Sequence, residues 1–489
     1  MTESVDGGVA PGLDFTIEID ATRDLAIDTD RVEALITVTA RPAESVTTAT
    51  RLAEVLIMDR SLSMLGHNKI DEARRAACAA IDALPDGALL GIIAGNEQAE
   101  SVFPGAGGLA QTDPRVRADA KRRVMTLLPE GGTRIGQWLV AASEIFSSAP
   151  GAGVIRHAVL YTDGRNEHET RPELDAALAR GADRFTCDVR GLGEDWNYNE
   201  VRHIANALRG SAKAVVDVAD LTSDFTELML QAARLVVQRT YLRLRLNDSF
   251  EVLTVERAYP DQADLTTSQR RVDSKTVEAP LGAWAAEQAV RRYQLSLRFD
   301  PGTVAVGTTL RVARVDLLAE LPDGTLESRA NEPLVIVRHD TPGFATIRPD
   351  TITRVYRERE LRYIIQDCVN AKLAGRSAEA DEHLERALRL ARQLGDERLP
   401  LLEGIAVADA GGKVRVRPDV TRGELQRVGL YSTMTTFQPP GGLSRDDGDG
   451  AASAPPAPER ACADCGEPAD DGDAFCQACG EPLEREVTP

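Results

Sequence analysis

Residues 54–64 read EVLIMDRSLSM, an apolar run that ends abruptly in polar residues. The first half is short, rich in Val, Leu, Ile and Met, and bounded by polar signals, which is typical of a strand buried in a parallel sheet. The second half places Asp59, Ser61 and Ser63 at alternate positions directly after that strand. In a tight turn, alternate side chains can face the same side. We therefore expect these three oxygen-bearing side chains to lie together.

The following segments alternate between helical and strand patterns. Residues 69–84 (KIDEARRAACAAIDAL) carry apolar or small side chains at helical spacing and stop before Pro85, and residues 89–94 (LLGIIA) form the next apolar strand. Further helices are predicted at 114–128, 134–148, from 172, at 198–209 and at 222–238, with strands at 158–163, 185–189 and 214–218. This alternation predicts an α/β domain at residues 50–238 with a doubly wound parallel sheet.

Two more oxygen-bearing side chains belong to this domain. Thr133 follows Gly131 and Gly132, whose small size lets the backbone approach closely, and Asp163 ends the strand AVLYTD. In open α/β sheets, ligand crevices form outside the carboxyl ends of the strands, where Asp59 and Asp163 both lie. Oxygen ligands in near-octahedral geometry suit a small hard cation, Mg²⁺ or Mn²⁺. Such an ion keeps an open position that a partner's carboxylate can fill.

These motifs resemble the von Willebrand factor A domain with a metal-ion-dependent adhesion site. The matching segments are DRSLSM at 59–64, GGTRIG at 131–136 and YTDG at 161–164, and GLGEDWNYNEVRHIA at 191–205 resembles bacterial members. The resemblance implies that Ser61, Ser63 and Thr133 offer hydroxyl oxygens, while Asp59 and Asp163 bind the metal directly or through water. Leu62 departs from the pattern, because Gly is frequent there.

Other interpretations of the site remain open. Asp and Ser are favoured at helix N-caps, so the first motif alone could be a capping turn. His168 and Glu167 follow Asp163 closely, and a metallohydrolase would need such a base. No Ser-His-Asp order, nucleophile elbow or Walker-type loop is found, so we expect a binding protein and not an enzyme. A third alternative, again by resemblance, is a chelatase-like subunit that serves an AAA+ ATPase.

The flanks of the α/β domain predict a second, split domain. Alternating strand patterns at 13–48 and 240–340 suit one antiparallel β-sandwich into which the α/β domain is inserted, as in bacterial relatives; a separate N-terminal hairpin is the alternative. Residues 350–398 predict a helical hairpin that packs against the sandwich or mediates dimerisation. Residues 399–436 form a short mixed segment.

The tail contains a second kind of metal motif. Residues 437–460 are rich in Pro, Gly, Ser, Ala and Asp, which predicts a flexible linker. Cys462, Cys465, Cys476 and Cys479 follow within 461–483 as two CxxC pairs, and four thiolates in this spacing make a closed Zn²⁺ cage that resembles a short zinc ribbon. Disulfides are the alternative, which a reducing compartment disfavours.

Composition limits the possible partners. The chain has 489 residues and a formal net charge of -20, which disfavours binding to nucleic acid or anionic membrane. The N-terminus lacks the pattern of a signal peptide and no stretch has the apolar length of a membrane span, so we expect a cytoplasmic protein. By resemblance, bacterial proteins of similar make-up are associated with serine/threonine kinases and phosphatases, which suggests a signalling or stress scaffold with a protein partner that offers an acidic side chain.

Overall fold

The structure is a computed structural model that describes most of the chain up to residue 435. The described ranges are 12–43, 51–105, 107–149, 151, 153–215, 218–321, 323–408, 411–435, 460–461 and 468–469. The chain divides into two units, Met1–Phe437 and Gln438–Pro489, and the first contains three groups of elements.

An α/β domain is built on one mixed sheet. Its strands, in spatial order, are β10 (Arg209–Val215), β9 (Thr186–Leu192), β8 (Val154–Thr162), β4 (Arg51–Asp59), β5 (Leu89–Gly95) and β6 (Ala99–Phe103), with β7 (Ala110–Gln111) also paired to β5. The first five strands are parallel, whereas β6 and β7 are antiparallel to β5. The predicted doubly wound parallel core is therefore confirmed, with an antiparallel edge that sequence patterns did not predict because its strands are short.

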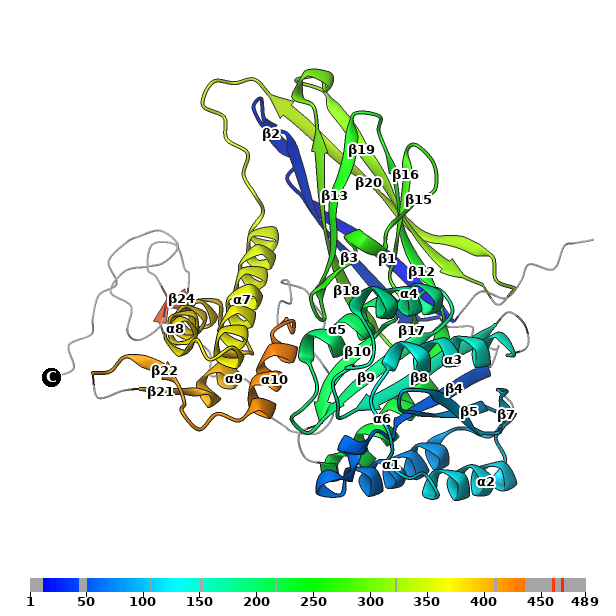
Figure 1. The fold of residues 1–489 in the computed structure, drawn as a ribbon. Helices are drawn as coiled ribbons and strands as arrows, with labels where there is room; N and C mark the ends of the chain where they lie inside the picture. Colours follow the sequence, from blue (N-terminus) through cyan, green and yellow to red (C-terminus); the bar gives the residue numbers. More distant parts are fainter. Residues whose placement is uncertain are drawn as a thin grey trace, which may run out of the picture. The chain divides into compact units, whose positions relative to one another are not determined.

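Helices cover both faces of this sheet (Figure 1). One face packs against α1 (Lys69–Ala83), α2 (Pro114–Met125) and α6 (Leu221–Ala232), and the other against α3 (Ile135–Ser147), α4 (Arg171–Gly181) and α5 (Tyr198–Ala207). The alternation of β4 explains this arrangement, because side chains point to opposite faces in turn. Leu56 and Met58 lie in the first core, and Val55 and Ile57 in the second.

The strand order reverses beside β4. Chain order runs from β4 to β5 on one side, and the later strands β8, β9 and β10 continue on the other. The crevice of such a sheet forms at this switch, outside the carboxyl ends of the strands. β4 ends at Asp59 and β8 ends at Thr162, one residue before Asp163. The fold thus brings the two predicted carboxylates to one place.

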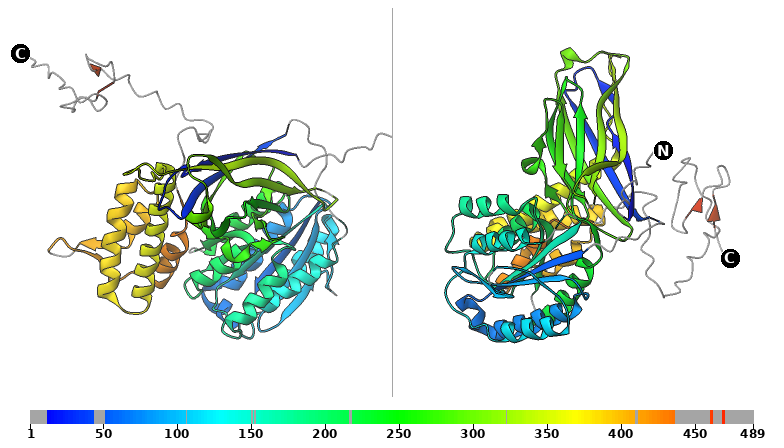
Figure 2. Two further views of the ribbon diagram at one scale, coloured as in Figure 1. Left: turned by 90° about the horizontal axis from the view of Figure 1, so that it is seen from above. Right: turned by 90° about the vertical axis from the view of Figure 1, so that its right-hand side faces the viewer.

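A β-sandwich is formed by strands from both sides of the α/β domain. One sheet has the order β1 (Leu13–Ala21), β3 (Arg31–Pro42), β18 (Ala289–Phe299), β13 (Phe250–Tyr259) and β14 (Ala263–Asp264). The other has the order β15 (Arg270–Arg271), β16 (Thr276–Pro280), β12 (Thr240–Leu246), β19 (Thr309–Glu320), β20 (Leu326–His339) and β2 (Asp24–Ala26). Because β3 pairs with β18 over ten residues, from Arg31↔Arg298 to Ala40↔Ala289, the N-terminal strands belong to this sandwich (Figure 2). Apolar residues of both sheets share one core.

C-terminal helices form the third group. The elements are α7 (Asp350–Leu373), α8 (Ser377–Leu394), α9 (Leu399–Gly404), β21 (Ala406–Ala408), β22 (Val414–Val416) and α10 (Arg422–Tyr431). Their apolar faces join the core that contains α3, α4 and α5, and Tyr198 Oη donates to Asn370 Oδ1 at 2.9 Å. α7 also reaches the sandwich: Ile352 and Val355 share a small core with Leu35 and Ala258, and Arg359 pairs with Glu256 at 2.9 Å. The hairpin thus packs on the sandwich, as expected, and its apolar faces also share a core with the α/β domain.

Other expectations differ in detail or lie outside the description. The helix predicted to 238 stops at Ala232, and β11 (Leu235–Val237) pairs with β17 (Trp284–Ala285) because an apolar β-branched run suits a strand.

In the tail, β23 (Arg460–Ala461) pairs with β24 (Pro468–Ala469). The four cysteines and the linker before Arg460 lie outside the described residues. Every helix in the described part of the chain is too short or too polar to cross a membrane.

Candidate functional site

Three loops meet at the carboxyl edge of the sheet and are tied together by backbone hydrogen bonds. Leu62 N donates to Gly131 O at 3.0 Å, and Glu130 N donates to Arg60 O at 2.7 Å. His168 N donates to Thr133 O at 3.2 Å, which links the third loop. The segments that carry the predicted ligands therefore hold one another in position before any ligand is considered.

Side chains from the loop after β8 also fix the start of α3. Asn166 Oδ1 accepts from Ile135 N at 3.0 Å, and Glu169 Oε2 accepts from Gly136 N at 2.8 Å. These are free amide groups of the first helical turn, which need such acceptors. A Cβ at Gly136 would lie 2.1 Å from Glu169 Oε1, so only glycine permits this approach. Thr133, just before the helix, lies close to Gly164, the residue after Asp163.

The structure brings all five predicted oxygen ligands together. We call the side chains of Asp59, Ser61, Ser63, Thr133 and Asp163 the oxygen cluster. Ser61 Oγ lies 2.8 Å from Ser63 Oγ, and Ser63 Oγ donates to Asp163 Oδ1 at 2.6 Å. Asp59 accepts from Ser61 N at 2.8 Å and from Thr162 Oγ1 at 2.6 Å. Ser63 is the exposed member of this otherwise buried group.

The two carboxylates of the oxygen cluster are in an unfavourable environment. Both Asp59 and Asp163 are fully buried. Burial, followed by repulsion from Asp163, raises the pKa of Asp59 to about 6, although hydrogen bonds from Ser61 and Thr162 oppose the change. Two buried negative charges this close favour a bound cation. The structure supplies one such charge internally: Lys69 Nζ donates to Asp163 Oδ2 at 2.6 Å.

The hydroxyl groups converge beside Gly164. A Cβ added to Gly164 would lie 3.1 Å from Thr133 Oγ1, 3.4 Å from Ser63 Oγ and 3.9 Å from Ser61 Oγ. Three oxygens thus face one point beside a residue without a side chain. The donors are all oxygen, two carboxylates and three hydroxyls, which is the chemistry of a Mg²⁺ or Mn²⁺ site. Among the described residues, no group of three or more His, Cys, Asp or Glu side chains has the arrangement of a metal site, and the oxygen cluster itself contains only two carboxylates.

His168, the base that a hydrolase would need, lies on the rim of the oxygen cluster. Its Nε2 is 3.8 Å from Glu97 Oε1, and both side chains are about half exposed, at 49% and 54%. The ring covers Gly132, where an added Cβ would come within 2.1 Å of His168 Nε2. The imidazole therefore faces Glu97 and Gly132.

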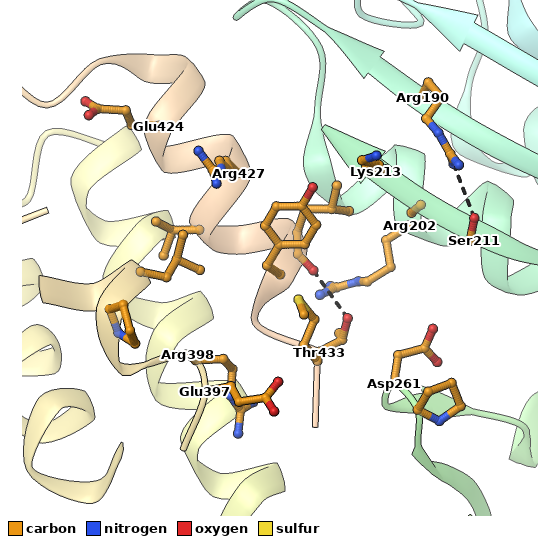
Figure 3. Close-up of a pocket in the computed structure, with 18 of the residues that line it drawn as sticks. Arg190, Arg202, Ser211, Lys213, Asp261, Glu397, Arg398, Glu424, Arg427 and Thr433 are labelled. Atoms are coloured by element: carbon orange, nitrogen blue, oxygen red, sulfur yellow. Dashed lines mark hydrogen bonds between the residues drawn. The ribbon is translucent and has the colours of Figure 1, made fainter. Parts of the chain in front are cut away.

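A cavity of about 850 Å³ lies away from this site and shares no residue with it. Its walls come from α5, β10 and the C-terminal helices, and Figure 3 shows Lys213 and Arg427 reaching it from opposite sides. Two of its cations share one carboxylate: Arg190 Nε pairs with Asp224 at 2.6 Å, and Lys213 pairs with the same carboxylate. Arg202, Arg398 and Arg427 line the cavity as well, but none of the five predicted oxygen ligands does, so the oxygen cluster is the stronger candidate site.

Sequence patterns missed three contributors to the site: Lys69, Thr162 and Gly164. In the sequence, Lys69 marks the start of a predicted helix. The signal for a further role is that a cation at this position is repelled by the positive end of the helix dipole. Thr162 and Gly164 flank Asp163, and their roles depend on where the other loops fall. The metal ligation of the oxygen cluster and of the four cysteines stays a prediction.

Comparisons with known proteins give the following similarities. The family model for the von Willebrand factor type A domain matches residues 53–214. A solved structure, von Willebrand factor type A from Catenulispora acidiphila, is 32% identical with a TM-score of 0.80, and the match covers 88% of this chain and 99% of that one. The ArnB paralog VWA2 from Sulfolobus acidocaldarius is 15% identical with a TM-score of 0.53, and the match covers 86% of this chain and 98% of that one. At this identity the similarity shows the fold alone. No curated protein gives a significant match.

Proposed function

The chain belongs to the von Willebrand factor type A family, and on that premise we propose that it is a metal-dependent protein-binding protein. The domain is suited to an interaction or adhesion module. In our proposal the oxygen cluster is an adhesion site that holds Mg²⁺ or Mn²⁺. The bound ion supplies a positive charge with an open position for a carboxylate of the partner.

One observation carries the proposal. Three loops, tied by backbone hydrogen bonds, bring two buried carboxylates and three hydroxyl groups to one small space beside Gly164. A purely structural capping turn would not need two fully buried carboxylates, of which Asp163 accepts a hydrogen bond from Ser63 and Asp59 one from Thr162. The residues lie at the carboxyl edge of the sheet, where Ser63 is exposed to a partner.

We propose binding and not catalysis because hydrolysis requires a base within hydrogen-bond reach of the attacking water. His168 faces Glu97 and covers Gly132 in this structure. We assign it to the rim of the binding surface. His168→Ala is therefore expected to retain Mg²⁺ binding.

The surface beside the oxygen cluster suggests what the partner offers. Leu62 and Leu65 belong to the short 3₁₀ helix η1 (Leu62–Asn68), and their exposed fractions are 56% and 64%. In a 3₁₀ helix, residues three apart lie on the same side, so the two leucines form one small apolar patch. We propose a partner segment in which a Glu or Asp lies next to an apolar side chain.

A capture experiment tests the proposal. The full chain is immobilised, incubated with lysate in Mg²⁺ or in EDTA, and the bound proteins are identified by mass spectrometry. Asp59→Ala should lose the proteins captured in Mg²⁺, and His168→Ala is the matched control on the rim. Equal capture in EDTA would contradict the proposal.

The same experiment identifies the partner class. From the resemblance we propose a cytoplasmic scaffold whose partners belong to a serine/threonine kinase or phosphatase system. Mg²⁺-dependent capture of such proteins would support this, and capture of unrelated proteins would exclude it.

For the tail, we propose that Cys462, Cys465, Cys476 and Cys479 bind one Zn²⁺ as a folding or docking module. Elemental analysis of the purified chain should find one zinc per molecule. Replacing Cys462 and Cys465 by Ser should remove it, and a chain with two disulfides and no zinc would contradict the proposal.

A further inference from the structure

Lys69 has an unusual position for a cation. It is the first residue of α1, its side chain is 8% exposed, and its Nζ lies 2.6 Å from Asp163 Oδ2. The end of the side chain passes beside Gly193, where an added Cβ would be 3.3 Å from Lys69 Cε. A larger residue at 193, which also has a positive φ of 66°, would push the ammonium away from Asp163.

Two costs oppose this position. A buried ammonium loses its hydration, and the amino end of a helix carries a partial positive charge that repels it. Asp163 offsets both costs through a charged hydrogen bond. The ion pair therefore explains why a lysine is tolerated there, and it takes up one oxygen of Asp163 while Oδ1 still faces Ser63.

The charge of the site depends on this lysine. With both aspartates ionised the oxygen cluster carries two negative charges, and Lys69 reduces the sum to one. A divalent ion would then bring the site to a net charge of plus one, whereas without Lys69 the sum would be zero. Lys69 repels the incoming metal, yet it leaves the loaded site more attractive to a carboxylate.

We propose that Lys69 is a tethered cation that holds the oxygen cluster together without metal and lowers its affinity for divalent ions. The inference rests on the proposed metal site and adds a control on its loading. Ser63 and Asp163 stay in contact in the metal-free protein because Lys69 neutralises one carboxylate. Metal occupancy then follows the free Mg²⁺ concentration, since the metal binds against a resident charge.

The test uses Mn²⁺ as the probe, with the free ion measured by electron paramagnetic resonance on the full chain in metal-free buffer. Lys69→Met keeps the length of the side chain and removes its charge; Lys69→Arg keeps the charge. We expect Lys69→Met to bind Mn²⁺ at least about tenfold more tightly than wild type, since a repulsive unit charge is removed. Its unfolding temperature should be lower than that of wild type without metal and should rise more on adding Mn²⁺. Lys69→Arg should stay close to wild type.

The outcomes separate the two proposals. If wild type binds Mn²⁺ and Asp59→Ala does not, while Lys69→Met binds no more tightly than wild type, the role of Lys69 is wrong and the metal site stands. If neither wild type nor Lys69→Met binds Mn²⁺, both are wrong. Should Lys69→Met fail to fold even with Mn²⁺, Lys69→Gln decides by the same affinity criterion.

Discussion

Strands β4 and β8 carry buried charged groups near both ends, and the two groups are organised differently. Toward the amino ends, Glu54, His157 and Asp188 form what we call the charged triad: His157 Nδ1 lies 2.8 Å from Glu54 Oε2, and Nε2 lies 3.0 Å from Asp188 Oδ2. At the carboxyl ends lies the oxygen cluster. All three triad residues are on strands, whereas the oxygen cluster depends on loops.

The charged triad compensates its charges internally. Burial lowers the pKa of His157, but the charge of Glu54 and hydrogen bonds to both carboxylates outweigh burial and raise it to about 10. Both ring nitrogens then donate as an imidazolium. The pKa of Asp188 is lowered: burial would raise it, but the hydrogen bond and charge of His157 prevail. Glu54 keeps a raised pKa because burial exceeds the effect of His157.

The difference shows how one sheet separates stability from binding. Glu54 and His157 are directly paired across β4 and β8, so the backbone fixes their contact. His157 contacts both carboxylates of the triad, whereas Lys69 contacts only Asp163 in the oxygen cluster, and the hydroxyls there face the space beside Gly164. Buried carboxylates that are paired with a cation within the sheet stabilise the fold. A buried carboxylate without such a partner at the edge of the sheet can bind a ligand.

The largest expected effect is on metal binding. Asp59→Asn preserves the size of the side chain but removes a carboxylate, and we expect metal affinity to fall at least about a hundredfold, or about 2.7 kcal/mol. The unfolding temperature without metal should hardly change, because repulsion with Asp163 is relieved. Mn²⁺ titration and thermal unfolding on the same sample measure both. A variant with wild-type affinity would refute the ligand role of Asp59.

A second substitution should show the reverse pattern. His157→Gln leaves two buried carboxylates without a cation and should lower the free energy of unfolding by about 3–5 kcal/mol. Mn²⁺ affinity should stay within about twofold, because distant sites act independently. Urea unfolding followed by tryptophan fluorescence gives the first quantity, since Trp138 and Trp196 report on the α/β domain. Loss of metal affinity would show that the two groups are coupled.

The charged triad also predicts a dependence on pH. The folded pKa of His157 is about 10 and its unfolded value is near 6.5, so its stabilising contribution is complete below pH 6.5 and is lost as pH rises through about 10. The unfolding temperature of the wild-type protein should thus fall between neutral pH and pH 10. His157→Gln should start lower and change less over that window. If the unfolding temperatures of the two proteins changed with pH in the same way, His157 would not be protonated in the folded state.

Filling the space beside Gly164 should weaken metal binding moderately. The backbone of Gly164 lies outside the left-handed region, so Gly164→Ala adds a methyl group 3.1 Å from Thr133 Oγ1 without backbone strain. We expect about a tenfold loss of Mn²⁺ affinity, which is about 1.4 kcal/mol. Gly66→Ala is the matched control, because nothing lies within 4 Å of its added Cβ. Equal affinities in both variants would place the ion elsewhere.

The smallest effect concerns the partner alone. Replacing Leu62 and Leu65 by Ala removes the apolar patch, and partner affinity should fall about three- to tenfold while Mn²⁺ affinity is unchanged. Both are measured with the partner identified by capture. Unchanged partner affinity would show that the partner contacts only the metal.

Local patterns in the sequence were enough for several features. The helix expected at 69–84 is α1 (Lys69–Ala83), and the strand expected at 158–163 is β8 (Val154–Thr162). A run of apolar residues with a regular spacing is enough to specify such a helix or strand, because each element must bury one apolar face in the core. Short edge strands such as β6 (Ala99–Phe103) were missed, since their pairing depends on a neighbouring strand more than on their own pattern.

The residue types and spacing of the oxygen cluster could likewise be read directly, since DxSxS, GGT and TDG each lie within a few residues. What needed the tertiary structure is every interaction between distant segments. Lys69 meets Asp163 across 94 positions, and Glu54 meets His157 across 103. Whether a buried charge is compensated or left open depends on which strands and loops become neighbours. The order of the strands in the sheet determines which segments become neighbours, and a linear pattern of polar and apolar residues does not contain this order.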